Sequence, residues 1–432
     1  MVIKRRKLGA ITIMKGWSAN CLFIFYIPLL CSFHVYCAAK DSLKRGEFLK
    51  DNGETLVSAG GDFELGFFTP NGSSGHKRYV GIWYTRDKQT VVWVANRDYP
   101  LINATGAFGL STDGYLQLWD TTNSEILYWQ PEDTSFCDLC TNQTVNLTDS
   151  GNLVYEDKWT PVWESFKYPT DTFLPGMLMD SNLILTSWSD RDDPGRGNFT
   201  FRVVVDLVED RVTLIIDKEG MIYWKNVDYG QLPLSNGMYF SALSGGFDSA
   251  RLAMHFSGKL EYWYQSSVGT ASLIQAEPSN RCSLYKICGN FGSCNPNIKL
   301  ACKCLPGFMP NAPRMWQSGD FSDGCVRNSI FCSDNDTFLS LKMMVVGENP
   351  NQKYEEVKTE TDCRKVCLTN CDCKSYSYEE HGSCWIWKQD LVKLQEEHPD
   401  GNNLFVRVAI SDIGTVLTVP FYFNLLEYLL SF

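Results

Sequence analysis

Twelve cysteines lie between Cys282 and Cys384 of a 432-residue chain. Segments this short bury too little apolar surface to be stable without cross-links, so the clustering predicts small modules held by disulfides. Zinc binding is the alternative, but the paired C-x2-C knuckles usual in zinc sites do not occur here, so we expect no metal and no cofactor. The cysteines form two groups of six: Cys282, Cys288, Cys294, Cys302, Cys304 and Cys325, followed by Cys332, Cys363, Cys367, Cys371, Cys373 and Cys384.

The N-terminus has the parts of a secretory signal. Five Lys or Arg precede an apolar run over residues 21–36, and small residues follow at Cys37-Ala38-Ala39. Cleavage after Ala39 would leave fourteen of the seventeen cysteines, an even number, as an oxidising compartment favours. An uncleaved anchor is disfavoured because the apolar run is short for a membrane span. We therefore expect a chain that is secreted or lies at the outer face of the plasma membrane.

Composition agrees with this location. Six asparagines stand in glycosylation acceptor sequences: Asn71, Asn103, Asn142, Asn146, Asn198 and Asn335. The formal net charge is −11, and the residues after Ala39 include 34 basic against 50 acidic side chains. This balance argues against nucleic acid as a partner.

Short apolar runs separated by Gly, Asn and Asp turns follow from residue 43 to about residue 163. Residues 63–68, 79–84 and 90–95 are such runs, and Thr112-Asp113-Gly114 is a hairpin signal. The same pattern continues to about residue 277. Strands at this spacing predict an all-β sandwich, barrel or prism.

Several motifs occur in the order known from one plant family. Residues 54–68 (ETLVSAGGDFELGFF), 81–84 (GIWY) and 91–98 (VVWVANRD) resemble a bulb-type, mannose-binding lectin domain. Residues 163–172 (WESFKYPTDT) resemble the next signature, and the cysteine groups resemble EGF-like and PAN/apple modules. From about residue 43 to 413 the chain is similar to S-locus glycoproteins and to the ectodomains of G-type lectin S-receptor-like kinases.

The resemblance implies a mainly β chain with two β-prism (bulb-lectin-like) domains, followed by disulfide-rich EGF-like and PAN/apple (α+β) modules. The expected segments are a signal peptide at 1–39, a bulb-type lectin domain at 40–163, an S-locus glycoprotein domain at 164–277, an EGF-like module at 278–327, a PAN/apple domain at 328–413 and a hydrophobic tail at 414–432. Pro420, Asn424 and Glu427 interrupt the tail, and no basic stop follows. A truncated or alternatively spliced end is preferred there over a membrane span or a lipid-anchor signal.

The family also implies how the cysteines pair. The EGF-like and PAN/apple frameworks give Cys282–Cys294, Cys288–Cys302, Cys304–Cys325, Cys363–Cys384, Cys367–Cys373 and Cys332–Cys371. From the residues themselves, a helix is expected to start at Thr361 or Asp362, which puts Cys363 and Cys367 on one face. For Cys137 and Cys140 a local disulfide is preferred to a redox pair, because no βαβ pattern surrounds them.

Sugar binding is the first function to consider. Bulb-type lectins hold mannose with a Q-x-D-x-N-x-V-x-Y strand, and the best frame here, residues 148–156, keeps only Asn152 and Val154. A second frame, residues 111–119, keeps only Asp113. A site built on hydrogen bonds loses most when a partner is missing. Asp113, Asn152 and Val154 are therefore the candidate carbohydrate-binding residues, although turn and strand roles are preferred for them.

Enzyme motifs are absent from the sequence. It contains no G-x-S-x-G, P-loop, H-E-x-x-H, H-R-D or D-F-G. We expect a non-enzyme that binds a peptide, protein or glycan, pairing with itself or with receptor-like kinases; the family's roles are recognition of pollen, defence and stress signalling. A soluble mannose-type lectin and the truncated product of a receptor kinase gene remain alternatives.

Overall fold

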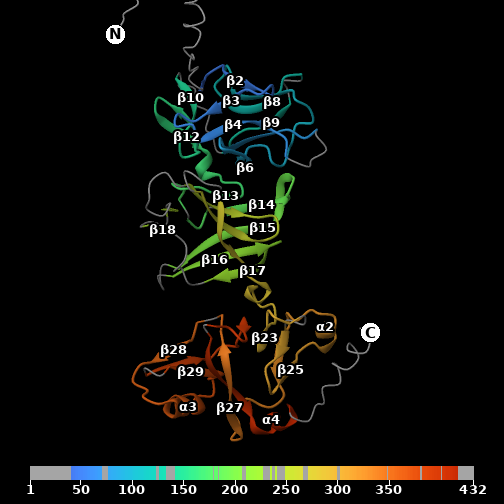
Figure 1. Ribbon diagram of the computed structural model, residues 1–432, viewed down its shortest axis with the longest axis vertical. Coiled ribbons are helices and arrows are strands. Elements are labelled where there is room, and N and C mark those ends of the chain that lie inside the picture. Colours follow the sequence, from blue (N-terminus) through green and yellow to red (C-terminus); the bar gives the residue numbers. More distant parts are fainter. Residues whose placement is uncertain are drawn as a thin grey trace, which may run out of the picture.

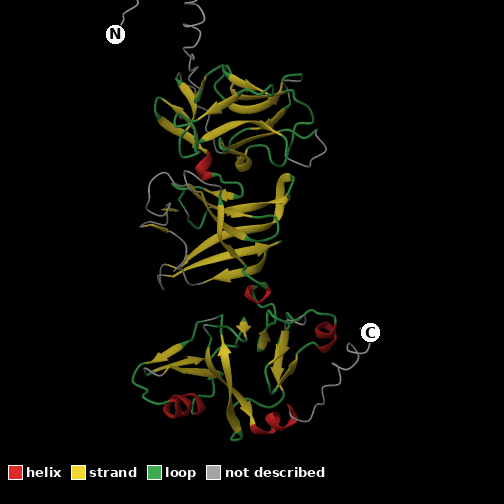
Figure 2. Cartoon of the chain, viewed as in Figure 1, coloured by secondary structure: helices red, strands yellow, loops and turns green. Residues whose placement is uncertain are grey.

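The computed structural model describes residues 40–416, apart from 71–75, 123–125, 133–141, 179, 183, 207–210, 227–233, 236–238, 241–248, 266–270, 299–301, 348, 380–381 and 400. The expected signal peptide, most of the expected tail, Asn71, Cys137 and Cys140 lie outside the described residues. The fold is mainly β, as predicted, and Figure 2 shows that its helices are few and short.

The first domain is built from three antiparallel sheets of four strands each (Figure 1). One contains β1 (Ser42–Lys44), β10 (Gln143–Leu147), β11 (Leu153–Asp157) and β12 (Thr160–Glu164). A second contains β2 (Phe48–Lys50), β7 (Gly106–Leu110), β8 (Leu116–Asp120) and β9 (Leu127–Trp129). The third contains β3 (Thr55–Val57), β4 (Phe63–Phe68), β5 (Tyr79–Tyr84) and β6 (Asp87–Val94).

The apolar side chains of these sheets point toward one core. Leu43, Leu65, Phe108 and Val145 come from the three sheets and are fully buried together. Alternation along β8 and β10, where buried and half-buried residues take turns, matches the period of two that a one-sided strand requires. The hairpin predicted around residues 112–114 joins β7 to β8.

The second domain lies next to the first along the long axis of the molecule (Figure 1). After the 3₁₀ turn Ser165–Lys167, one sheet contains β13 (Thr172–Phe173), β20 (Ser249–Met254), β21 (Leu260–Gln265) and β22 (Ser272–Glu277). Another contains β14 (Ile184–Asp190), β15 (Asp193–Asp206), β16 (Arg211–Lys218) and β17 (Met221–Asn226), and a two-stranded ribbon contains β18 (Leu234–Ser235) and β19 (Tyr239–Phe240). Phe173 and Phe201 belong to the same buried cluster as the core of the first domain, so the two domains pack through continuous apolar contact.

The two cysteine-rich modules follow at the far end of the molecule (Figure 1). The first contains β23 (Gly292–Cys294), β24 (Cys302–Cys304), β25 (Phe308–Pro310), β26 (Cys325–Arg327) and the short helix α2 (Pro313–Gln317). The second is a five-stranded sheet with the order β27 (Asp336–Met344), β32 (Asn402–Ala409), β29 (Ser375–Glu379), β30 (Ser383–Trp387) and β28 (Gln352–Tyr354). The helix α3 (Glu360–Leu368) packs against β29 and β30, and α4 (Ile410–Val416) follows β32.

One strand of the second module belongs to the sheet of the first. β31 (Leu394–Gln395) pairs in parallel with β23, placing Leu394 opposite Ser293 and Gln395 opposite Cys294. Polar side chains reinforce the joint, because Glu396 accepts a hydrogen bond from Ser293 Oγ at 2.5 Å and pairs with Lys303 Nζ at 2.7 Å. The two modules therefore share a sheet.

The start of α3 corrects a prediction. Its N-cap is Thr359, and neither Thr361 nor Asp362. The Thr359 Oγ1 accepts the backbone N–H of Asp362 at 3.2 Å and donates to the Asp362 carboxylate at 2.6 Å, which satisfies an amide that the first turn leaves without a partner. Cys363 and Cys367 are both buried, as expected for two residues on one face of the helix.

Candidate functional site

The mannose frame of the first domain is occupied by internal hydrogen bonds. Asn152, directly before β11, is 8% exposed. Its Nδ2 donates to Glu164 Oε2 at 3.0 Å, and its Oδ1 accepts from Ser165 Oγ and from the Phe166 backbone N–H, both at 3.1 Å. The amide of Asn152 therefore ties β11 to the segment after β12, leaving it little capacity for a sugar hydroxyl.

The other two candidates lie apart from each other. Val154 is on β11, opposite Asn146 on one side and Glu164 on the other. Asp113 is exposed in the turn between β7 and β8, on a different sheet. The structure thus places Val154 on β11 and Asn152 directly before it, and does not bring Asp113 to them.

The acceptor asparagines differ in exposure. Asn103, Asn142, Asn198 and Asn335 are exposed, whereas Asn146 is half-buried. Asn146 Nδ2 donates to Glu156 Oε1 at 2.6 Å.

Six disulfides stabilise the C-terminal modules. They are Cys282–Cys294, Cys288–Cys302, Cys304–Cys325, Cys332–Cys371, Cys363–Cys384 and Cys367–Cys373, the same pairs that the family resemblance implies. Each such bond contributes roughly 2–4 kcal/mol, mainly by restricting the unfolded chain. Of the two tryptophans of β30, Trp387 is in the core, and Trp385 is half-buried with Lys353 Nζ 4.7 Å from its ring centroid.

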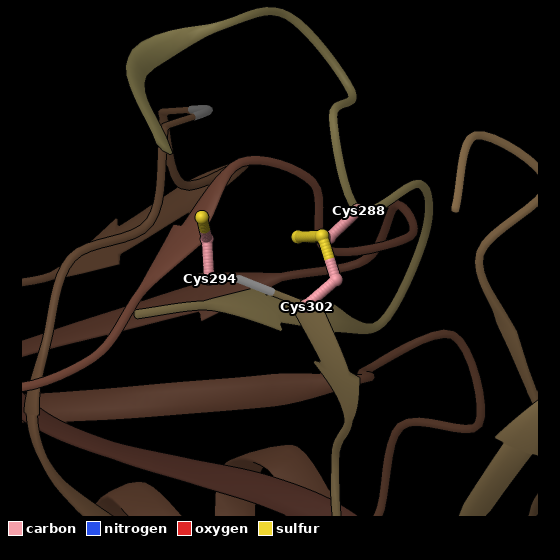
Figure 3. Close-up of side chains that lie close together, drawn as sticks. All are labelled: Cys288, Cys294 and Cys302. Carbon is pink, nitrogen blue, oxygen red and sulfur yellow. A yellow bond between two sulfur atoms is a disulfide. The ribbon is translucent and has the colours of Figure 1, made fainter. Parts of the chain in front are cut away.

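Three sulfur atoms of the first module lie close enough to suggest a metal site. They belong to Cys288, Cys294 and Cys302 (Figure 3). Cys288 is bonded to Cys302, however, and Cys294 is bonded to Cys282. A zinc ion is bound by thiolates, and sulfur atoms in disulfides do not supply them. The proximity of these atoms is therefore explained by two adjacent disulfides.

A cleft of about 730 Å³ lies at the junction of the first and second domains, and we call it the junction cleft. One wall follows the end of β6 and continues through Asn96-Arg97-Asp98. A second wall is formed by β9 and the residues after it, and a third by residues 167–170. The second domain contributes residues from β14 and β15. Cavities of this size at domain junctions are common ligand sites.

Aromatic rings form the floor of the junction cleft. Trp93, Trp129 and Trp163 contact one another with ring centroids 5.7 to 5.9 Å apart. Tyr168 stacks on Trp163, with centroids 5.8 Å apart and an interplanar angle of 12°. The Trp93 Nε1–H donates to the backbone oxygen of Tyr168 at 3.0 Å, so the floor and the third wall are held together.

Arg97 fixes the second domain against the first. Its side chain is buried, and it donates to the carbonyl oxygens of Pro194 at 2.9 Å, Thr186 at 3.0 Å and Ser187 at 2.7 Å. Burial lowers the pKa of Arg97, while nearby carboxylates, first that of Asp171, act in the opposite direction. The planar guanidinium can satisfy several carbonyls at once, so this residue sets how the two domains face each other across the cleft.

The remaining cations of the cleft are paired at its edge. Arg196 of the second domain contacts Asp98 of the first, with Nε and Oδ2 2.7 Å apart. Lys167 Nζ lies 2.9 Å from Glu164 Oε1. Beside the cleft, Lys77 Nζ pairs with Asp193 Oδ2 at 3.0 Å and makes another contact between the domains.

No pattern in the sequence predicted this cleft. Some of its residues belong to the motifs at 91–98 and 163–172, which in the sequence only indicate a family. Others belong to β9 and β14, which contain no recognised motif. The available signal was the density of aromatic residues in the two motifs. It could not show that they meet at a domain junction.

Within the described part of the chain, no helix is both long enough and apolar enough to cross a membrane.

Three family models match the chain, in the order expected. Residues 90–189 match a D-mannose binding lectin model, residues 218–312 an S-locus glycoprotein domain and residues 332–394 a PAN-like domain. None of the three is a kinase domain.

Curated relatives match most of the chain. A G-type lectin S-receptor-like serine/threonine-protein kinase of Arabidopsis thaliana is 40% identical over 91% of this chain and 50% of its own length. Another from that plant, named B120, is 33% identical over 90% of this chain and 50% of its own length. The chain spans about half the length of the curated relatives it matches.

Among solved structures, the Japanese Marasmius oreades lectin aligns with 29% of this chain and 90% of its own, at 16% identity and a TM-score of 0.22. The assignment depends on the sequence matches alone. By its domain order and its relatives, the chain belongs to the family of G-type lectin S-receptor-like kinases and S-locus glycoproteins and has the domains of their ectodomain-like half.

Proposed function

We propose that this chain is the ligand-recognition part of an S-domain receptor of the receptor-like kinase class, binding a peptide, protein or carbohydrate outside the cell. The observation that carries the proposal is the junction cleft, of about 730 Å³, floored by aromatic rings and edged by polar side chains. Such a site recognises a ligand by contact and hydrogen bonding.

The cleft is well suited to binding without a large rearrangement. Arg97 holds the two domains through four carbonyl oxygens, and Trp93 holds the backbone at Tyr168. Walls that are fixed before the ligand arrives lower the entropic cost of binding. In this proposal the ligand binds between the two β domains, and the disulfide-bonded modules link these domains to a partner protein.

Pairing with a second copy, or with a receptor-like kinase, is part of the same proposal. The exposed apolar side chains of the second domain, among them Met221 and Ile274, support it. Sedimentation velocity of the secreted protein, with and without the relative's ectodomain, measures such pairing directly. A single monomeric species at every concentration and mixture would remove this part of the proposal.

A chimeric receptor tests the recognition function. Residues 1–416 are joined to the membrane-spanning and kinase segments of the 40%-identical relative, and kinase phosphorylation is measured after treatment with apoplastic fluid or cell-wall hydrolysate. We expect a dose-dependent response that Asn182→Ala in the cleft weakens. Trp159→Ala, at an 86% exposed aromatic residue outside the cleft lining, is the control. An unresponsive chimera, although displayed at the cell surface, would contradict the proposed function.

A further inference from the structure

We propose that the junction cleft is a binding site for a neutral oligosaccharide, distinct from the mannose frame on β11. This inference rests on the proposed function and names the ligand class of the same site. Three features of the cleft carry it: its aromatic surfaces, its polar side chains and the pairing of its cations.

The aromatic surfaces suit a sugar ring. Tyr168 is partly exposed and lies flat against Trp163, so its outer face is a fixed, flat and weakly polar platform. Tyr128 and Trp129, both half-buried on β9, line the neighbouring wall. The C–H faces of a pyranose are apolar and flat, and they bury surface against an aromatic ring while the hydroxyls point outward.

Polar side chains line the same cleft and can hydrogen-bond such hydroxyls. Gln130 and Asn182 are exposed and line the cleft from the first and second domains respectively. An amide offers both a donor and an acceptor, and a sugar hydroxyl does the same. Thr186 and Thr200 add hydroxyl-bearing side chains to the second-domain wall. Aromatic platforms surrounded by amides and hydroxyls recognise polyhydroxylated ligands better than purely apolar ones.

The cations of the cleft are already paired, and the exposed Glu132 is the one lining carboxylate for which the described residues show no ion pair. Arg196 is paired with Asp98, Lys167 is paired with Glu164, and Arg97 donates to backbone carbonyls next to Asp171. An acidic ligand would have to compete with the existing carboxylates for each cation. A basic ligand would have to compete with Arg196 for Asp98 and would have Glu132 as its one other carboxylate in the lining. A neutral ligand meets no such competition, because ion pairs accept or donate hydrogen bonds without being broken.

The mannose frame and the cleft are separate sites. Asn152 and Val154 are not among the residues that line the cleft. Asn152 bonds instead to Glu164, the carboxylate that also holds Lys167 at the cleft edge. The mannose frame therefore supports the cleft wall. Binding at the cleft does not require the residues that the frame has lost.

The test uses the secreted, disulfide-bonded chain on an array of neutral oligosaccharides (mannan, cellulose, xylan and galactan fragments), acidic oligogalacturonates, and acidic and basic peptides. Affinities of hits are measured by calorimetry for the wild type, for Gln130→Ala with Asn182→Ala, for Tyr168→Ala and for the control Trp159→Ala. The two amides are exposed, so the double variant keeps its fold; thermal unfolding checks Tyr168→Ala.

We expect at least one neutral oligosaccharide to bind, with affinity falling about tenfold or more in the double variant and unchanged in the control. An array without neutral hits, hits restricted to oligogalacturonates or peptides, or neutral binding untouched by the double variant would each overturn the inference. If the array is blank but the chimeric receptor still responds, the ligand class is wrong and the recognition function stands. If a neutral sugar binds but the chimera is silent, the cleft stands and the receptor role fails.

Discussion

Arg407 Nε donates to Asp336 Oδ2 at 2.7 Å, and both side chains are almost completely buried between β32 and β27. Asp336 is shared, because Arg327 at the end of the first cysteine-rich module also pairs with it. The other nitrogens of Arg407 donate to the oxygens of Leu368 at 3.2 Å and Asn370 at 2.9 Å, at the end of α3. One guanidinium therefore connects the helix, the sheet and the module boundary.

The first prediction concerns this network. Arg407→Met removes one partner of a buried carboxylate and takes one donor each from the carbonyls of Leu368 and Asn370. We expect a loss of about 3–5 kcal/mol in the free energy of unfolding, measured in guanidinium with disulfides intact. Arg314→Met, at an exposed arginine of α2, is the matched control and should change stability by less than about 0.5 kcal/mol. Equal losses in the two variants would contradict the role of the network.

The second prediction concerns pH. Burial raises the pKa of Asp336, but the hydrogen bonds from Arg327 and Arg407 outweigh it, so the pKa is lowered overall. A carboxyl whose pKa is lower in the folded state stabilises the fold above its unfolded pKa of about 3.9, and this contribution is lost as pH falls through the folded pKa. We expect the free energy of unfolding to decrease on acidification below about pH 4.

Asp336→Asn provides the comparison for that titration. The variant should be less stable than the wild type at neutral pH, with a smaller further decrease on acidification. Urea unfolding from pH 5 down to about pH 2 measures both slopes. Parallel pH profiles for the two proteins would show that Asp336 does not carry this pH dependence.

The third prediction concerns the domain junction. Arg97→Met removes a donor from four backbone carbonyls of the second domain, and each carbonyl left unsatisfied in a buried place costs about 1–3 kcal/mol. We expect the unfolding of the two β domains to separate into distinct calorimetric transitions and proteolysis near residues 165–171 to accelerate. Arg191→Met, at an exposed arginine of the same region, should leave both unchanged. Identical behaviour of the variants would mean that the shared apolar core alone couples the domains.

The fourth prediction separates stability from sugar binding at the old frame. Asn152→Ala removes three hydrogen bonds and should lower the free energy of unfolding by about 1–3 kcal/mol, without changing any response to mannose. Asp113→Ala, at an exposed turn residue, should change stability by less than about 0.5 kcal/mol. Loss of a mannose response in Asn152→Ala at unchanged stability would restore the frame as a binding site.

Much of the fold followed from local patterns. Apolar runs such as residues 63–68 and 79–84 predict strands because they are bounded by turn residues, and they form β4 and β5. The start of α3 was misplaced by two residues or more because Thr359, Thr361 and Asp362 are all good caps. The choice among them depends on where the helix packs, with Cys363 and Cys367 inward.

The candidate site was less accessible to sequence reasoning. Tyr168 is 75 positions from Trp93, and Asn182 comes from the turn before β14 of the other domain, so their proximity depends on how two domains pack. The three mannose-frame residues were found by motif, yet a motif gives no information on hydrogen bonds already made. Only the contacts of Asn152 with Glu164, Ser165 and Phe166 reveal that its amide is engaged.

The pairing of β31 with β23 has a consequence for how such chains can be recombined. Recombination between related genes at a point between the two cysteine groups would combine β23 from one gene with β31 from another. The two strands would then not have been selected together. The backbone hydrogen bonds would re-form in any sequence, but Ser293, Lys303 and Glu396 would have to match across the joint. Crossovers that keep residues 282–409 together should therefore survive selection more often than crossovers within them.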